Sequence, residues 1–125
     1  MVVNLYVDGG TRGNVICLYD PQRFKTIVKK RKGTFTNNDL EYLAVIYGIE
    51  YAKKYYPKES PIIIKSDSLL VVNQTKGRWK VNGDKLRLLN IKTLRKINSH
   101  IRLKWVPREV NLAGIHLESL KDTLR

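Results

Sequence analysis

The sequence has a single cysteine, Cys17, so it cannot form an internal disulfide. It has no hydrophobic run long enough to cross a membrane and no basic start followed by an apolar core, which predicts neither a membrane span nor a signal peptide. Internal repeats and low-complexity linkers are also missing, so one domain over residues 1–125 is expected. Cys17 lies among apolar residues, which is typical of a buried thiol, and a reducing, cytoplasmic setting fits these features.

Acidic residues are scarce in this chain: 11 Asp and Glu stand against 24 Lys and Arg, and the formal net charge is +13. Such an excess is typical of proteins that bind nucleic acid or an anionic membrane surface. Because no membrane segment is predicted, nucleic acid is the better-supported partner. The contents of hydrophobic residues (42%) and charged residues (28%) are typical of a folded protein rather than a disordered one.

One of the few acids, Asp8, follows the first predicted strand, VVNLYV, and precedes two glycines. Glycine here allows either a sharp turn or the close approach of another segment. An acid at the end of a buried strand suits a metal ligand, although Asp is also a common turn residue. Strands over 14–19 and 23–32, joined by a turn at Asp20-Pro21, extend the first strand into a predicted antiparallel meander.

A long helix is predicted from Asn38 to the lysines before Pro57. Apolar residues recur at steps of three and four from Leu40 to Tyr51, as on one face of a helix. Asn38 has the chemistry of an N-cap, and Glu41 stands three residues later, which is the spacing of a capping box. Two roles are therefore open for Glu41: it caps its own helix, or it belongs to a site.

The apolar run PIIIKS, residues 61–66, predicts a central strand, and it also ends on an acid, Asp67. A short helix follows, so Asp67 equally suits a helix cap. A strand, a helix and a strand in this order make a right-handed parallel crossover, which would bring Asp8 and Asp67 to one sheet edge with Glu41 facing them. Crowded carboxylates repel one another unless a divalent cation neutralises them, and oxygen ligands favour Mg²⁺ or Mn²⁺.

The segment after this short helix, NQTKGRWKV, is polar and basic around one tryptophan. Charge and stacking suit this segment to a nucleic-acid backbone, and the candidate contacts are Lys76, Arg78, Trp79 and Lys80. A solvated loop with Trp79 packed on the core explains the same pattern. A helix over 84–98 and a strand over 101–106 follow. The helix residues predicted to face the core are Leu86, Leu89, Thr93, Leu94 and Ile97.

The motifs DGG at Asp8, TNNDLE ending at Glu41 and SDS around Asp67 resemble the signatures of the ribonuclease H type 1 family, in the same order along nearly the whole chain. WVPRE, residues 105–109, resembles the branch with a short loop after this strand. The resemblance implies an α/β ribonuclease H-like fold: a five-stranded mixed sheet, with three antiparallel strands followed by alternating helix and strand, flanked by helices. Larger members carry a basic helical protrusion for which this chain is too short.

The same resemblance implies a metal-dependent endonuclease that cuts the RNA strand of RNA–DNA hybrids. It implies two divalent cations, one activating a water and the other stabilising the leaving 3′-oxygen. Asp8 would bridge the cations, while Glu41 and Asp67 would hold the leaving-group side. The residues that match family contacts to the hybrid are Asn14, Asn37, Asn38 and Ser68. Recognition through 2′-hydroxyls and groove shape implies weak sequence specificity, and neither a membrane nor an obligatory protein partner is indicated.

The sequence departs from the family at its fourth acid, which the family places four residues after an asparagine. Counting from Asn111 reaches Ile115, which cannot bind a metal; a one-residue slip reaches His116, and Glu118 lies one turn beyond Ile115. His116 is therefore a candidate catalytic and metal-binding residue, but it equally suits a packed histidine on a helical stripe. The other members of that stripe are Ala113, Leu117, Leu120 and Leu124. The flexible-loop histidine of many members is also missing.

Two other functions remain open on these residues. A weakened fourth position favours a hybrid- or duplex-binding module of the same fold, and another nuclease of the superfamily would act on DNA junctions or strand ends. The intact TNN and SDS segments favour hybrid cleavage over both. Metal-dependent cutting distinguishes the enzyme from the binding module, and a panel of substrates distinguishes the nucleases. A basic domain with unrelated carboxylates would require three motifs to coincide.

Overall fold

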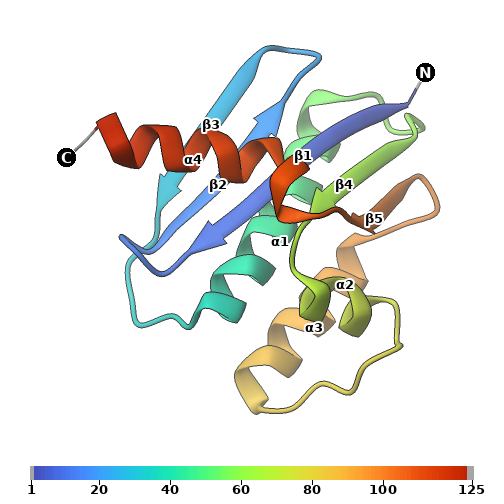
Figure 1. Cartoon of the computed structure of the whole chain (residues 1–125). Helices are drawn as coiled ribbons and strands as arrows, with labels where there is room; N and C mark the ends of the chain where they lie inside the picture. Colours follow the sequence, from blue (N-terminus) through green and yellow to red (C-terminus); the bar gives the residue numbers. More distant parts are fainter. Residues whose placement is uncertain (1, 124–125) are drawn as a thin grey trace.

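A five-stranded sheet in the order β3-β2-β1-β4-β5 is the centre of the computed structural model, which describes residues 2–123 and the side chains of residues 2–119. The strands are β1 (Val3–Gly10), β2 (Val15–Asp20), β3 (Lys25–Lys30), β4 (Ile62–Ser66) and β5 (Ile101–Trp105). The first three strands are antiparallel neighbours, and β4 lies parallel to both β1 and β5. The mixed ribonuclease H-like sheet expected from the sequence is therefore confirmed (Figure 1).

The helices cover the two faces of this sheet (Figure 1). They are α1 (Asn37–Tyr55), α2 (Leu69–Thr75), α3 (Asp84–Lys96) and α4 (Leu112–Thr123), with a short 3₁₀ helix, η1 (Arg108–Val110), before α4. Helix α1 packs on one face of the sheet, α2 and α3 pack against α1 on that side, and α4 crosses the opposite face over β1 and β2. Within the described residues, no helix combines the length and the apolar character needed to cross a membrane.

Each face of the sheet has its own apolar layer, because successive side chains of a strand point to opposite faces. On β1, Leu5 and Val7 are buried in the large layer beneath α1. Tyr6 points the other way, into a smaller layer with Cys17 of β2 and residues of α4. The thiol of Cys17 is buried, as expected. Asp8 follows the alternation of Tyr6, so its side chain emerges on the face that α4 covers.

The pairing of β1 with β4 sets the position of two acids. The last matched pair is Tyr6 with Lys65, in a parallel register. Asp8 lies two residues after Tyr6, and Asp67 lies two residues after Lys65. The crossover therefore brings both acids to the same sheet edge, as predicted.

Helix α1 begins earlier than predicted, and its capping residues are different. Thr36 is the N-cap: its hydroxyl accepts from the backbone N–H of Asp39 at 3.1 Å, and the Asp39 carboxylate accepts from the N–H of Thr36 at 2.9 Å. The predicted capping box of Asn38 and Glu41 is wrong, since Thr36 and Asp39 have the same spacing two residues upstream. Lys85 also pairs with Asp39 at 3.1 Å. The side chain of Glu41 therefore does not cap α1.

Gly9, directly after Asp8, allows α1 to approach β1 closely and does not form a turn. Strand β1 continues to Gly10, and the turn follows over residues 11–14. A Cβ atom on Gly9 would lie 2.4 Å from the carbonyl oxygen of Leu40. Only a residue without a side chain allows α1 to come this near to β1, and this contact brings the first turns of α1 to the strand that carries Asp8.

One core residue was predicted wrongly on α3. Leu94 is exposed, whereas Leu89 and Thr93 are buried as expected and Leu86 and Ile97 pack partly buried against the core. Asn90, one turn before Leu94, is buried, and its side-chain amide donates to the hydroxyl of Tyr42 at 3.2 Å. The polar Asn90 can be buried because this hydrogen bond satisfies it.

Candidate metal centre

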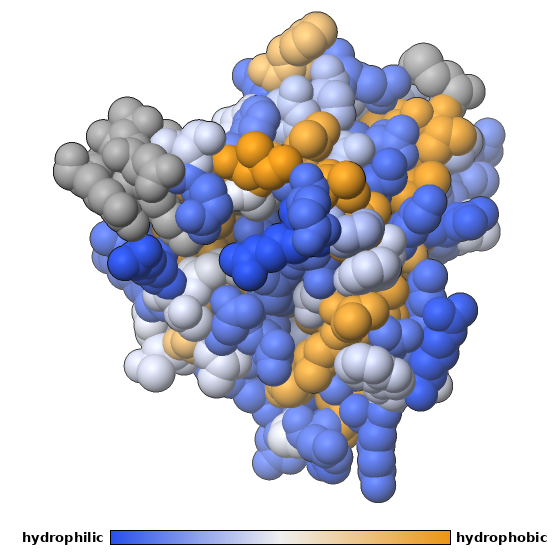
Figure 2. Space-filling model, viewed as in Figure 1, coloured by the Kyte–Doolittle hydropathy of each residue, from blue (hydrophilic) through white to orange (hydrophobic). Residues whose placement is uncertain are grey.

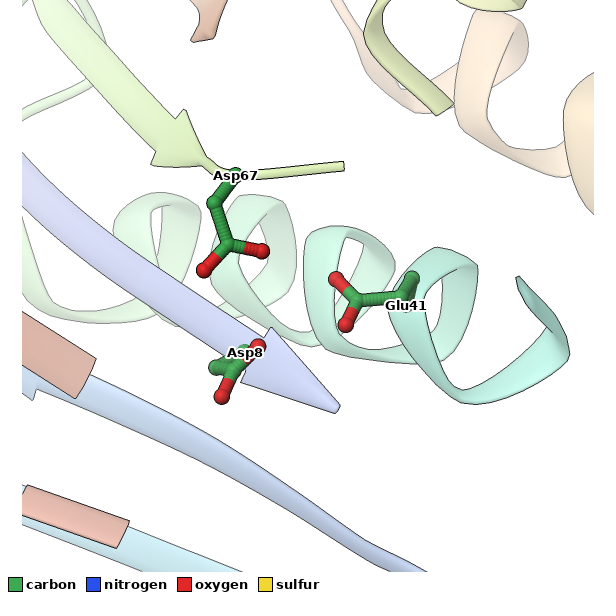
Figure 3. Close-up of side chains that lie close together, drawn as sticks. All are labelled: Asp8, Glu41 and Asp67. Atoms are coloured by element: carbon green, nitrogen blue, oxygen red, sulfur yellow. The ribbon is translucent and has the colours of Figure 1, made fainter. Parts of the chain in front are cut away.

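Three carboxylates meet at the edge of the sheet. Asp8 near the end of β1, Asp67 directly after β4 and Glu41 in the second turn of α1 each offer an oxygen, and these oxygens all lie within 4.8 Å of one another. Figure 3 shows the three side chains pointing toward one another from three separate elements. The predicted convergence of these acids is therefore present in the fold.

The simpler structural explanations for two of these acids are wrong. Asp39, not Glu41, completes the capping box of α1. Ser68, not Asp67, caps α2, because the Ser68 hydroxyl accepts from the backbone N–H of Val71 at 3.1 Å. Neither Glu41 nor Asp67 is needed to start a helix, so their shared position requires another reason.

Burial and mutual repulsion dominate the electrostatics of the cluster. Desolvation, followed by the charge of Asp67, raises the pKa of Asp8 to about 6, while Arg108 acts to lower it. Desolvation and the charges of both aspartates raise the pKa of Glu41 to about 9. The Glu41 side chain is nearly closed off, at 5% exposure, and its Oε2 accepts no hydrogen bond from any described residue. A buried oxygen without a donor is costly, and a bound cation would relieve that cost.

Two neighbours hold Asp67 in place. The amide nitrogen of the fully buried Asn111 donates to Asp67 Oδ2 at 3.2 Å and to the carbonyl of Val7 at 2.9 Å. The indole N–H of Trp105 donates to the backbone carbonyl of Asp67 at 3.1 Å. Neither Asn111 nor Trp105 was predicted as part of the site. Trp105 pairs in register with Ser66, one residue before Asp67. The predicted pairing of these two strands could therefore have placed Trp105 beside Asp67.

A cleft of about 300 Å³ opens over the carboxylates. Its wall also includes Asn37, the two arginines Arg12 and Arg108, and Glu118 of α4. Neither arginine forms an ion pair with another described residue. Arg12 and Arg108 were not predicted from the sequence, because single arginines are uninformative in a chain this basic. Their place beside three acids is a property of the fold.

His116 does not join the carboxylates. Its Nδ1 atom lies 2.9 Å from the hydroxyl of Thr26, and its ring centroid lies 4.2 Å from that of Tyr19, so it packs on the sheet. It is absent from the wall of the cleft. The placement agrees with the packed-histidine alternative, since Ala113 and Leu117 of the same stripe are buried. Leu124 and the side chain of Leu120, also predicted in that stripe, lie outside the described residues.

The predicted hybrid-contacting residues divide into two groups. Asn37 and Asn38 are exposed on the first turn of α1, and Asn37 reaches the cleft. Asn14 and Ser68 have structural partners instead. The Asn14 amide donates to the carbonyl of Gly33 at 2.7 Å, which ties the β1–β2 turn to the segment leading into α1.

The basic segment between α2 and α3 is open to solvent. Lys76, Arg78 and Lys80 are exposed, and Trp79 is 48% exposed, so it is only partly packed on the core. The side-chain amide of Gln74 anchors the segment by donating to the backbone carbonyl of Lys80 at 3.0 Å. The side-chain carbonyl of Gln74 accepts from the hydroxyl of Tyr42 in α1. Hydrophilic residues also cover most of the face seen in Figure 2. The surface suits a charged partner better than an apolar one.

Comparisons with known proteins support the same family. A family model described as "Reverse transcriptase-like" matches residues 6–117. The chain is 36% identical over 121 residues to the bifunctional protein Rv2228c of Mycobacterium tuberculosis, covering 89% of this chain but 33% of that protein. It therefore spans about a third of the length of this relative.

Solved structures agree with the match. The N-terminal RNase H domain of Rv2228c is 31% identical, with a TM-score of 0.71 over 94% of this chain and 95% of that one. RNase H1 of the archaeon Halobacterium salinarum NRC-1 is 28% identical, with a TM-score of 0.73 over 98% and 99% of the two chains. LC11-RNase H1, solved with an RNA/DNA hybrid, is 24% identical with a TM-score of 0.77 over 98% and 99%, which shows a common fold.

Proposed function

This chain belongs to the reverse transcriptase-like family and is an enzyme of the ribonuclease H type 1 class, and from that premise we propose that it cuts the RNA strand of RNA–DNA hybrids with two divalent cations. The observation that supports this most strongly is the meeting of Asp8, Glu41 and Asp67 within 4.8 Å. A fold relative crystallised with an RNA/DNA hybrid supports the choice of substrate. The net charge of +13 favours any polyanionic duplex.

The donor set fits Mg²⁺ or Mn²⁺. It consists of carboxylate oxygens, and one of them, Glu41 Oε2, is buried without a hydrogen bond from any described group. When bound, the cations supply the positive charge that activates a water molecule and stabilises the leaving 3′-oxygen. Asp8, Glu41 and Asp67 are the residues that would hold the cations. Asn111 keeps the Asp67 carboxylate aimed at the cluster through its 3.2 Å hydrogen bond.

The surfaces beside the cluster are assigned to the two strands of the hybrid. Asn37 and Asn38 stand exposed at the start of α1, where their amides can donate to and accept from 2′-hydroxyls or base edges of the minor groove. Arg12 and Arg108 line the cleft without an ion pair to another described residue, and they are suited to phosphate oxygens of the strand being cut. The basic segment with Lys76, Arg78, Trp79 and Lys80 is assigned to the DNA backbone.

The test is cleavage of an end-labelled RNA–DNA hybrid in Mg²⁺, in Mn²⁺ and in chelator. Wild type should cut the RNA strand only with metal, and Asp8→Asn should lose about a thousandfold or more of the rate, since metal ions supply several kcal/mol of transition-state stabilisation. Asp84→Asn is the matched control, because Asp84 is an exposed acid at the start of α3. Parallel reactions with duplex DNA, duplex RNA and single strands identify the substrate class.

One observation favours a second candidate, a binding module of the same fold. The gap-free match to the family's fourth acid, Ile115, is a partly exposed apolar residue without ligand atoms. Tight binding of the hybrid without cutting in any metal would support this candidate and contradict the nuclease. Cutting of junctions or DNA ends in preference to the hybrid would contradict both.

A further inference from the structure

A buried polar network joins α1 to the basic segment between α2 and α3. Its centre is Tyr42, whose side chain is buried where α1 packs against α2 and α3. The Tyr42 hydroxyl donates to the side-chain carbonyl of Gln74 at 2.6 Å and accepts from the side-chain amide of Asn90 at 3.2 Å. Both partners are buried as well, so these hydrogen bonds satisfy polar groups that water does not reach.

Gln74 extends this network to the surface. It lies near the end of α2, and its side-chain amide donates to the backbone carbonyl of Lys80 at 3.0 Å. The residues just before Lys80 are held by the backbone instead, since the N–H groups of Arg78 and Trp79 both donate to the carbonyl of Asn73. The Gln74 side chain therefore closes the loop at Lys80, where the backbone has left the helix.

The network begins next to the metal centre, because Tyr42 directly follows Glu41 in the sequence. Consecutive residues of a helix point in directions about 100° apart, so one turn of α1 presents Glu41 to the sheet edge and Tyr42 to α2 and α3. This turn also packs tightly on the sheet, since Gly9 lets the backbone of Leu40 lie directly against β1. The positions of the carboxylates and of the basic segment are thus both set by one helical turn.

We propose that Tyr42 is a positioning residue for hybrid binding: acting through Gln74, its hydroxyl holds the basic segment in a fixed place relative to the carboxylates, so that the segment meets the duplex when the RNA strand reaches the metal centre. This inference rests on the proposed function. Burial raises the pKa of Tyr42 above its ordinary value of 10.0, so at neutral pH the hydroxyl keeps the proton that it donates.

The basic segment needs such support because its charged side chains do not order it. Lys76, Arg78 and Lys80 are exposed, and long exposed side chains retain much conformational freedom. Holding the backbone in place before the hybrid arrives lowers the entropy that is lost on binding. Loss of the Tyr42 hydroxyl should therefore weaken hybrid binding and leave the chemical step unchanged.

The experiment compares Tyr42→Phe with Tyr51→Phe, which is its matched control. Each substitution removes one buried hydroxyl from α1, but Tyr51 donates to Asp20 of β2, at 2.8 Å, and not to α2. In cleavage of the hybrid with Mg²⁺, Tyr42→Phe should raise KM about fivefold and keep kcat within about twofold of wild type. Tyr51→Phe should match wild type in both.

A second variant tests whether Tyr42 acts through Gln74. Gln74→Met keeps the length of the side chain but removes its hydrogen bonds to Tyr42 and Lys80, and it should reproduce the higher KM. Adding Tyr42→Phe to Gln74→Met should raise KM no further, because two residues that act in one chain of contacts are not additive. A thermal unfolding scan of each variant gives the fraction folded under the assay conditions.

Binding in chelator separates positioning from a general loss of stability. In fluorescence anisotropy with a labelled hybrid, Tyr42→Phe should weaken Kd and lower the slope of log Kd against log salt by about one, because the displaced segment neutralises fewer phosphates. Tyr51→Phe should keep the wild-type Kd and slope, since its lost hydroxyl does not touch the segment.

Two outcomes would overturn the proposal. Either Tyr42→Phe has the KM and the salt slope of Tyr51→Phe, so that the network is only structural, or Tyr42→Phe and Gln74→Met raise KM additively. Both leave the proposed nuclease intact. If wild type binds the hybrid but cuts it in no metal, the proposed cleavage fails by itself. A weaker Kd and lower slope for Tyr42→Phe than for Tyr51→Phe would then still support the positioning role, and equal values would overturn it.

Discussion

The side-chain amide of Asn111 donates to Oδ2 of Asp67 across 3.2 Å, and so connects the entrance of α4 to the acid that follows β4. The same amide nitrogen bonds the carbonyl of Val7, one residue before Asp8. One buried side chain therefore ties together α4, β4 and β1 at the place where the carboxylates meet.

Replacing Asn111 should damage both stability and metal binding. Asn111→Ala removes donors to Val7 and Asp67 and the acceptor of the Ala113 N–H, leaving buried groups unpaired, and should lower the free energy of unfolding by about 2–3 kcal/mol. Denaturant titration and Mn²⁺ calorimetry measure the two effects. The exposed Asn82→Ala serves as the control. Unchanged Mn²⁺ affinity in Asn111→Ala would show that Asn111 does not orient Asp67.

The metal-free protein should lose stability as the pH rises. The pKa of Glu41 is about 9 in the folded chain against an ordinary 4.5, so the folded state holds a proton that the unfolded state releases. This stabilisation is complete below pH 4.5 and is lost as the pH approaches 9, by at most about 1.4 kcal/mol per pH unit.

Glu41→Gln tests this dependence, because it removes the titrating group and should flatten the slope. The free energy of unfolding is measured by denaturation in chelator between pH 5 and pH 9, with the exposed Glu50→Gln of the same helix as control. Saturating Mg²⁺ should also reduce the wild-type slope, since the cation replaces the proton. A wild-type slope that equals the Glu41→Gln slope would contradict the proton assignment.

Arg108 should shift the acid limit of activity, which burial of Asp8 and the charge of Asp67 mainly determine. Its positive charge lowers the pKa of Asp8, so Arg108→Ala should raise that pKa above about 6. The acid limb of the pH–rate profile for hybrid cleavage then moves upward, by roughly half a unit for an exposed charge. Arg108→Lys keeps the charge and should stay close to wild type. A uniform rate loss at every pH would instead assign Arg108 to substrate contact alone.

The basic segment should govern the salt dependence of binding. Replacing Lys76, Arg78 and Lys80 together with alanine should lower the slope of log Kd against log salt by roughly one for each phosphate that is no longer neutralised. Fluorescence anisotropy with a labelled hybrid in chelator gives this slope. The triple alanine variant of Lys53, Lys54 and Lys58 removes equal charge at the far end of α1. Equal slopes for the two triple variants would contradict a specific role.

Much of the sheet and three acids of the site could be predicted because they follow short-range rules. An apolar run that ends on an acid predicts a carboxylate at a sheet edge, and crossover handedness then places Asp8 beside Asp67. The N-cap could not be decided in the same way. Thr36 with Asp39 and Asn38 with Glu41 have identical spacing, and only tertiary contacts, such as Lys85 on Asp39, favour one of them.

The α4 side of the site depends on the rotation of a helix, which sequence spacing does not determine. His116 and Glu118 both lie near the family's fourth position, and the orientation of α4 follows from the packing of its apolar residues on β1 and β2. That packing turns His116 toward Tyr19 and Glu118 toward the cleft. Trp105 was missed for a similar reason, since its hydrogen-bond partner, the carbonyl of Asp67, comes from a distant part of the chain.

The pairing of β1 with β4 and the late position of α4 also determine when the centre can exist during synthesis. Its acids come from positions 8, 41 and 67, and the side chain that steadies Asp67 comes from position 111. The parallel pair joins segments more than fifty residues apart, so local contacts alone cannot form it. A nascent chain that has not yet released residue 111 holds the acids without Asn111. Formation of the complete acidic site therefore requires that the chain has emerged and folded at least as far as residue 111.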